Sequence, residues 1–240
     1  MEAGINEIFY SIQGEGILTG FPFLFIRFGG CNLNCPYCDT KWSRKTKKHC
    51  LVYYYRKKMK IKNPVSISQL KTLIKPYKYD YVSLTGGEPL LQQKFIEGSL
   101  NIFKNKKILI ETNGTLYDNI SETLIKRIDY WSVDIKLPSI TKKDCIKELN
   151  LFLKGLKKAK YVILKCIFSD EVPASELRLA GMIAKNFYKT NKNLSLIFQP
   201  IMKGKKVKIK KSINLVYSIM ENAHFEVRLI PQMHKYLALK

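Results

Sequence analysis

The stretch that decides the fold runs from Phe23 to Cys38 and reads Phe23-Leu-Phe-Ile-Arg-Phe28-Gly-Gly-Cys31-Asn-Leu-Asn-Cys35-Pro-Tyr-Cys38. A short apolar run ends at two glycines, and a loop with three cysteines follows. Aromatic and β-branched residues in a run of this length, bounded by glycine, favour a β-strand. We therefore expect a strand over 23–28 that delivers the cysteine loop to one edge of a sheet.

The same arrangement recurs along the chain, where short apolar runs alternate with amphipathic stretches. The expected strands are Glu7–Ile12, Phe23–Phe28, Tyr81–Leu84, Lys107–Glu111, Tyr130–Ile135, Tyr161–Phe168, Leu194–Phe198 and Phe225–Leu229. The expected helices lie near 66–75, 91–104, 121–127, 141–158, 173–188 and 206–222. Ser66 with Gln69, and Thr141 with Asp144, resemble capping boxes at two helix starts. This alternation predicts βα units and a parallel sheet.

Polar and glycine-rich motifs follow several of these strands. They are Gly29-Gly30-Cys31, Thr85-Gly86-Gly87-Glu88-Pro89, Thr112-Asn113-Gly114, Lys136 and Gln199-Pro200. Parallel strands of an α/β fold bring their carboxyl ends to one side, where such folds place their chemistry. We therefore expect one active site built from these loops.

Length and composition indicate one domain over residues 1–240. The chain has 240 residues, 46% of them hydrophobic, which allows a sizeable core without disulfides. The longest apolar stretch, 21–28, is well short of the roughly 18 residues of a membrane-spanning helix. The N-terminal residues do not resemble a signal segment. We expect a cytoplasmic protein whose six cysteines are reduced.

The chain is strongly basic, with 42 Lys and Arg against 19 Asp and Glu, a net charge of +23. Such a charge can indicate nucleic-acid binding. Only six of the basic residues are Arg, however, and Arg is the side chain that phosphates and base edges favour. A solvated surface with a patch for an acidic partner is the favoured interpretation, and we do not expect nucleic-acid binding.

The charge is concentrated in a basic insertion over residues 41–62. This segment holds ten basic residues and no acidic one, together with Trp42, Tyr53, Tyr54 and Tyr55. Basic residues interleaved with aromatic ones can bind single-stranded nucleic acid. They can also attract an acidic electron-transfer protein, or simply form a solvated loop-and-strand segment. The sequence leaves these three interpretations open.

Cys31, Cys35 and Cys38 form the sharpest motif. Three thiolates within eight residues can hold one small metal centre, and four would saturate a cubane iron–sulfur cluster. Three leave one iron open for chemistry. The alternatives are structural cysteines, or a zinc site of Cys35 and Cys38 with His49 or Cys50. The spacing alone does not identify the metal. Cys145 and Cys166 lie in apolar segments and are expected in the core.

With Tyr37 and the downstream Gly86-Gly87-Glu88-Pro89, the cysteine motif resembles that of the radical S-adenosylmethionine (SAM) superfamily. The resemblance implies an α/β fold, a partial, open TIM-like barrel of parallel strands with flanking helices. It also implies a [4Fe–4S] cluster on Cys31, Cys35 and Cys38, whose open iron binds SAM. One electron then cleaves SAM and releases a 5′-deoxyadenosyl radical.

Further motifs resemble one family within it, the 7-carboxy-7-deazaguanine synthases, over residues 5 to 237. They are Ser11-Ile-Gln-Gly-Glu-Gly16, Cys38-Asp-Thr40, Glu111-Thr-Asn-Gly-Thr115, Val133-Asp-Ile-Lys-Leu-Pro138 and Gln232-Met-His-Lys-Tyr236. The resemblance implies ring contraction of 6-carboxy-5,6,7,8-tetrahydropterin to 7-carboxy-7-deazaguanine with loss of ammonia, a step of queuosine biosynthesis. The radical would take a hydrogen atom from C6, and the product radical would take it back, so that SAM is regenerated.

The resemblance also assigns roles to residues. Those implied for the substrate are Ile12, Gln13, Gly14, Glu15, Arg27, Thr85 and His234, and those for SAM are Tyr37, Cys38, Asp39, Gly87, Asp134, Lys136 and Gln199. Arg27 could grip the pterin carboxylate as a fork, and Glu15 could accept from the guanidine-like ring edge. Thr40 would bind Mg2+. Asp134 and Lys136 could instead form a strand-end ion pair, and His234 could serve in packing.

The same resemblance implies a homodimer and an electron donor such as flavodoxin or ferredoxin. Two other functions stay open from the sequence. One is another small radical SAM enzyme such as a glycyl-radical activase, against which Gln13-Gly-Glu-Gly16 and His234-Lys-Tyr236 argue. The other is a zinc-bearing RNA-binding module, which the net charge of +23 suggests.

Overall fold

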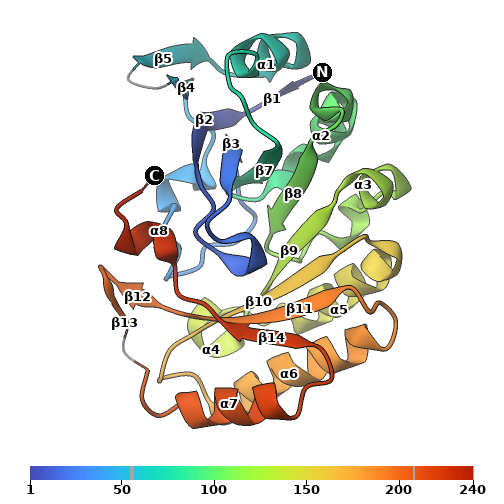
Figure 1. Ribbon diagram of the computed structural model, residues 1–240. Coiled ribbons are helices and arrows are strands. Elements are labelled where there is room, and N and C mark those ends of the chain that lie inside the picture. The colour runs from blue at the N-terminus through green and yellow to red at the C-terminus, as the bar shows by residue number, and fades with distance from the viewer. Residues whose placement is uncertain (55–56, 208, 240) are drawn as a thin grey trace.

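A mostly parallel sheet of ten strands organises the computed structural model, which describes residues 1–54, 57–207 and 209–239 (Figure 1). The strands, in their order across the sheet, are β14 (Glu226–Leu229), β11 (Leu194–Pro200), β10 (Val162–Phe168), β9 (Tyr130–Ile135), β8 (Lys107–Thr112), β7 (Tyr81–Gly86), β3 (Pro22–Phe28), β2 (Ile5–Ile12), β4 (His49–Tyr54) and β5 (Lys57–Lys62). Two short pairs stand apart, β1 (Glu2–Ala3) with β6 (Val65–Ser66) and β12 (Met202–Lys203) with β13 (Lys206–Val207).

Neighbouring strands from β14 to β3 all run parallel, so their carboxyl ends lie at one edge. The β2–β3 and β4–β5 pairs are antiparallel. In the described part of the chain β14 and β5 are the two outer strands and no pairing joins them. The expected open α/β fold with a parallel sheet is therefore confirmed.

The described helices mostly lie along one side of the sheet and cover its outer face, but the C-terminal helix lies apart from them (Figure 1). They are α1 (Ile67–Ile74), α2 (Gln93–Ser99), α3 (Glu122–Arg127), α4 (Pro138–Thr141), α5 (Ile146–Gly155), α6 (Ala174–Tyr188), α7 (Ile213–Glu221) and the C-terminal α8 (Met233–Tyr236), with 3-10 turns η1 (Gly16–Leu18), η2 (Lys41–Arg44), η3 (Pro89–Gln92), η4 (Leu100–Phe103), η5 (Tyr117–Asn119) and η6 (Leu156–Lys158). No described helix is long and apolar enough to cross a membrane.

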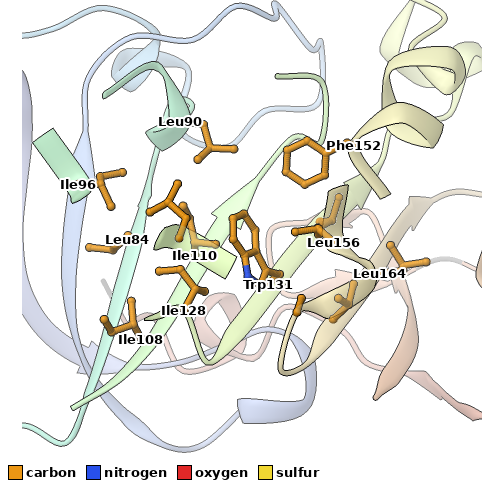
Figure 2. Close-up of a cluster of buried hydrophobic side chains, with 14 of the residues drawn as sticks. Leu84, Leu90, Ile96, Ile108, Ile110, Ile128, Trp131, Phe152, Leu156 and Leu164 are labelled. Carbon is orange, nitrogen blue, oxygen red and sulfur yellow. The ribbon is translucent and has the colours of Figure 1, made fainter. Parts of the chain in front are cut away.

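The main core fills the space between the outer face and these helices. Figure 2 shows Trp131 of β9 at its centre, with Phe152 of α5 and Leu164 of β10 around it. The Trp131 and Phe152 rings meet edge-on, with centroids 6.1 Å apart. Cys50 and Cys166 are buried in the same core, as expected for Cys166.

Side chains alternate between the two faces of each central strand, because successive Cβ atoms point to opposite sides. On β10, Val162 and Leu164 belong to the main core, whereas Ile163 belongs to a small cluster on the inner face. Leu18 of the β2–β3 connection packs into that inner cluster, so this connection lies across the inner face. It carries residues 13–16 into the concave side of the sheet.

All eight expected strands are confirmed to within two residues at each end, and the helix starts are corrected in two places. The capping box of Ser66 and Gln69 is present at α1. The one expected at Thr141 and Asp144 is wrong, because Thr141 ends α4 and Lys142 turns left-handed at φ +61°. The helix expected over 141–158 is thus interrupted, and α5 begins at Ile146. The helix expected from 206 begins at Ile213, after a hairpin.

The basic segment 41–62 forms more regular structure than expected. After η2 it folds into β4 and β5, which extend the sheet. The two strands pair antiparallel, with His49 opposite Lys62. Buried Cys50 and Val52 of β4 fix one side of this extension to the core. The exposed lysines of β5 lie on the outer strand, where like charge discourages pairing with another sheet. Tyr55 and Arg56 lie outside the described residues.

Candidate active site

A cavity of about 480 Å3 opens at the carboxyl ends of the parallel strands, on the inner face of the sheet. Its volume is within the usual range for small-molecule sites. The structure places every residue singled out from the sequence on its wall: Ile12, Gln13, Gly14, Glu15, Arg27, Cys31, Cys35, Tyr37, Cys38, Asp39, Thr40, Thr85, Gly87, Asp134, Lys136, Gln199 and His234. Segments more than 200 residues apart in the sequence thus meet in one place.

The cysteine loop follows β3 and is held by backbone hydrogen bonds to η2. Cys31 N donates to the Arg44 carbonyl at 3.2 Å, and Gly30 N donates to the Ser43 carbonyl at 3.0 Å. All three cysteines are free thiols; Cys35 is buried, and Cys31 and Cys38 are half-buried. Burial raises the pKa of the Cys31 thiol. Three free thiols on one cavity wall fit the ligand set of a cluster with one open iron.

The zinc alternative finds no support in this arrangement. His49 and Cys50 lie on β4 and are not among the residues that line the cavity. Cys50 is fully buried in the main core. Cys145, expected in the core, is buried next to Leu33 and Cys35, and so packs behind the cysteine loop.

The glycine loop after β7 packs directly against the start of the cysteine loop. A Cβ on Gly87 would lie 2.0 Å from the Gly30 carbonyl oxygen, and one on Gly86 would lie 2.2 Å from that of Phe28. Gly86 also has a φ of +142°, which favours glycine. These glycines therefore allow the backbone of the glycine loop to contact the backbone that follows β3. This contact fixes the position of the cysteine loop in the cavity wall.

Glu88 joins this contact to the next strand. Its carboxylate is fully buried and accepts from Thr112 Oγ1 at 2.8 Å, Asn113 N at 2.7 Å and Leu90 N at 3.1 Å. Burial outweighs these donors and raises the pKa of Glu88 to about 7. The side chain thus braces the β7 and β8 loops against each other.

A chain of buried charges crosses the cavity wall. Lys136 Nζ lies 2.6 Å from Asp134 Oδ2, and Lys165 Nζ lies 3.3 Å from Asp134 Oδ1 and 2.6 Å from Glu15 Oε2. Burial opposes each charge, but the partners outweigh it: they raise the pKa of Lys136 and lower that of Asp134. Lys136 also lies over the Tyr37 ring, with Nζ 5.6 Å from its centroid. The predicted strand-end pair of Asp134 and Lys136 exists and belongs to a larger network.

The C-terminal segment closes one side of the cavity. Gln232 Nε2 donates to Glu15 Oε1 at 2.8 Å and to Asp39 Oδ2 at 3.1 Å, and Met233 N donates to the Gly14 carbonyl at 2.9 Å. A Cβ on Gly14 would lie 2.5 Å from His234 Nδ1, so glycine is needed for this approach.

Glu15, Asp39 and His234 bring possible metal-ligand atoms within 4.8 Å of one another. Lys165 and Gln232 already bond Glu15, and Lys235 Nζ lies 3.7 Å from Asp39 Oδ2. We therefore interpret this group as an ion-pair and hydrogen-bond network that joins three distant segments.

Arg27 lies on the inner face of β3, in register with Thr85 of β7. Its Nε donates to Glu7 Oε2 at 3.3 Å, and its guanidinium lies over the rings of Phe9 and Trp42, at 5.4 and 5.8 Å. The side chain is only 15% exposed. Arg27 is thus held by an acidic and two aromatic neighbours on the wall of the cavity.

Gln199 carries an acceptor without a protein partner. It is 1% exposed and lines the cavity, yet its Oε1 has no hydrogen-bond partner in the described part of the chain. Buried polar atoms are nearly always paired, so this atom is suited to a ligand.

Several cavity residues were given no role from the sequence: Glu111, Gln232 and Lys235, which were named only within motifs, and Lys165. Glu111 accepts from Ser83 Oγ at 2.6 Å and from Gln13 Nε2 at 3.3 Å. Strand alternation could have indicated two of these residues. Residues two apart on a strand face the same side of the sheet. Glu111 therefore faces the same side as Leu109, and Lys165 the same side as Ile163, and all four side chains lie on the inner face.

The fold and the cysteine site together define a radical SAM protein: residues 25–163 match the model of the Radical SAM superfamily. The relatives are more specific. The 7-carboxy-7-deazaguanine synthase of Archaeoglobus fulgidus is 32% identical and covers all of both chains. That of Geobacter sulfurreducens is 31% identical over 98% of this chain and 97% of its own. The chain belongs to the 7-carboxy-7-deazaguanine synthase family.

A solved structure supports the fold. The crystal structure of QueE from Escherichia coli matches with a TM-score of 0.62 and 22% identity, and covers 98% of this chain and 95% of that one. The resemblance drawn from the sequence is confirmed, and with it the [4Fe–4S] cluster and SAM as cofactors. The activase and zinc-module alternatives are not supported.

The close contact of the glycine loop gives a first prediction. Gly87→Ala should move the cysteine loop, because the new methyl group would meet the Gly30 carbonyl oxygen, and reconstituted protein should lose most of its cluster iron. Gly204→Asn is the control, since Gly204 has open space around it and a φ of +60° that Asn tolerates. Iron assays on both variants check this; full iron in Gly87→Ala would contradict it.

Proposed function

We propose that this protein converts 6-carboxy-5,6,7,8-tetrahydropterin to 7-carboxy-7-deazaguanine with loss of ammonia, in the synthesis of queuosine or another 7-deazapurine. One observation carries the proposal: this chain, which matches relatives named for this activity over their full length, lines one cavity with three free thiols, Arg27 and Glu15. Cys31, Cys35 and Cys38 would hold the cluster. When bound, the cluster and SAM supply a 5′-deoxyadenosyl radical that takes a hydrogen atom from the substrate and returns it.

The SAM subsite lies on the proposed cluster side of the cavity. Gln199 Oε1, which has no hydrogen-bond partner among the residues that the structure describes, suits an N–H or O–H of the cofactor. Asp134 and Lys136 offer one charge of each sign, which suits an amino acid moiety. Tyr37, Cys38, Asp39 and Gly87, the other residues of the predicted set, also line the cavity.

The substrate subsite is built around the β2–β3 connection. Glu15 and Gln13 offer acceptors and an amide donor, and the backbone of Ile12 and Gly14 lies beside them. A carboxylate accepts two N–H bonds, which suits the guanidine-like edge of a pterin. Thr85 and His234 lie on the same wall. These groups would hold the ring edge and exclude water from it.

Arg27 would hold the substrate carboxylate. Its contact with Glu7 uses Nε, one of five guanidinium donors, so the remaining N–H groups can serve a carboxylate. Phe9 and Trp42 limit its movement. A low-dielectric wall of this kind strengthens the pairing.

Mg2+ is the third predicted cofactor. The hydroxyl of Thr40 lies on the cavity wall and offers the hard oxygen donor that Mg2+ prefers. The carboxylate of the substrate and water would supply the other ligands.

The experiment that tests the function is anaerobic turnover with a reductant, SAM and 6-carboxy-5,6,7,8-tetrahydropterin. We expect 7-carboxy-7-deazaguanine and ammonia in equal amounts. Cys35→Ala should give neither product, because it removes a cluster ligand. Cys166→Ala is the control: it removes a thiol of the main core and should retain the cluster iron. A wild-type protein with full iron and no product would contradict the proposal.

Arg27 gives a quantitative prediction. Removing one partner of a buried charge pair costs on the order of 2–5 kcal/mol, or roughly 30- to several-thousand-fold in affinity. We expect Arg27→Ala to weaken substrate binding by this factor, and Arg27→Lys to recover only part, since an ammonium forms no fork. Binding is measured without reductant, with Arg127→Ala, on α3 outside the cavity, as the control. Affinity of Arg27→Ala within threefold of wild type would exclude the role.

The electron donor is proposed to bind beside the cysteine loop. Arg44 contacts this loop twice: its Nη2 donates to the Cys35 carbonyl, and its backbone carbonyl accepts from Cys31 N. On β5, Lys60 lines a hollow together with Trp42, Lys47 and Lys48, and Lys58 and Lys62 are exposed on the same strand. An acidic flavodoxin or ferredoxin would be drawn there by long-range attraction. A homodimer and a cytoplasmic location stay predictions.

This surface is tested by charge reversal. Changing Lys58, Lys60 and Lys62 to Glu should slow cluster reduction by an acidic flavodoxin by about tenfold or more at low salt, and the difference should shrink as salt rises. Reduction by a small uncharged reductant should not change. The control reverses the exposed Lys154, Lys157 and Lys158 of α5 and η6, which gives the same net charge. Equal slowing in both variants would show that only net charge matters.

A further inference from the structure

Lys165 is a buried lysine at the centre of the cavity wall that the proposed function leaves without a role. It lies on β10, in register with Asp134 of β9, and its side chain is 8% exposed. Its ammonium lies 2.6 Å from Glu15 Oε2 and 3.3 Å from Asp134 Oδ1. A buried ammonium is stable only when it is paired, and these two carboxylates provide the pairing.

The two carboxylates differ in how firmly the fold holds them. Asp134 belongs to a central strand and has a second partner, Lys136, at 2.6 Å. Glu15 belongs to the connection between β2 and β3, and its side chain is held by Lys165 and Gln232. Lys165 therefore links the Glu15 carboxylate, which lies on a loop, to the firmly held Asp134 carboxylate of the sheet.

Lys165 also maintains the charge of Glu15. Burial by itself would raise the pKa of Glu15, but the attraction of Lys165 and the hydrogen bond from Gln232 outweigh it and lower the pKa to about 2. Glu15 is therefore an acceptor at any pH at which the enzyme would work. Lys165 and Gln232 use about two of the four lone-pair sites of a carboxylate, so that two remain for a ligand.

We propose that Lys165 is a positioning residue for the substrate: it holds the Glu15 carboxylate, from its anchor on Asp134, in the place where Glu15 receives the N–H groups of the pterin. The proposal rests on the proposed function. It assigns to Lys165 no contact with the substrate, so its effect must pass through Glu15.

A double-mutant cycle on substrate binding tests this path. Reconstituted holoenzyme is titrated with 6-carboxy-5,6,7,8-tetrahydropterin in the absence of reductant, so that no turnover occurs. We expect Lys165→Met and Glu15→Gln each to weaken binding by about 10- to 100-fold, the range for a hydrogen bond to a charged group. The double variant should bind no more than about threefold more weakly than Glu15→Gln alone. If Lys165 acts on binding only through Glu15, the effects of the two substitutions on the binding free energy do not add. Lys160→Met, which changes a lysine paired with Asp129 outside the cavity, is the control.

The pH profile separates positioning from a general loss of packing. The charged and polar groups around Glu15 are Lys165 of β10, Asp134 of β9, Asp39 of the cysteine loop, and Gln232 and His234 of the C-terminal segment, with Glu111 of β8 facing Lys165. Without Lys165 the pKa of Glu15 should rise, so Lys165→Met should bind the substrate progressively more weakly as pH falls from 7.5 to about 5.5. The double variant lacks Glu15 and retains His234, so it should not show this added dependence.

The outcomes are distinct. Wild-type holoenzyme that does not bind the pterin contradicts the proposed function itself. Full additivity in the cycle contradicts only the positioning role. If Lys165→Met yields no cluster-bearing protein, the cycle is repeated with Lys165→Gln, whose shorter side chain is uncharged but keeps an N–H donor. Loss of the cluster in that variant too would make Lys165 a structural residue and overturn the proposal.

Discussion

The alternation of side chains along the parallel strands is the constraint on which the rest of the structure depends. Each central strand sends one set of side chains into the main core and the other into the concave face. On β9, Trp131 and Val133 point to the core, while Asp134 lies on the cavity wall. A shift of one residue in the register would bury the charges and expose the core. The apolar outer set therefore fixes where the polar inner set must lie.

Charge pairing makes that inner set stable. The protein carries a net charge of +23, yet Lys136, Lys165 and Lys235 on the cavity wall each lie beside a carboxylate. The excess positive charge lies largely outside, as on the exposed β5 strand. Glu15, Lys165, Asp134 and Lys136 sum to no net charge, which is what burial requires. The cavity can thus offer both signs of charge to ligands that carry both.

Much of this could be predicted from the sequence, because the signals were local. The spacing of Cys31, Cys35 and Cys38 and the position of Gly87 after a strand require no tertiary information. The structure places all the residues singled out on one cavity. Boundaries were less accurate: the helix break at Lys142 depends on a left-handed residue, and β4 and β5 exist because Cys50 and Val52 pack into the core. Lys165 and Gln232 were missed because their roles arise from partners 150 and 217 residues away.

The central claim is that this cavity brings a radical source and a pterin together for a reversible hydrogen-atom transfer. The most direct measurement uses substrate deuterated at C6 under anaerobic turnover. We expect deuterium to appear in recovered SAM, with little net 5′-deoxyadenosine. Formation of one 5′-deoxyadenosine for each product, with no deuterium in SAM, would contradict it.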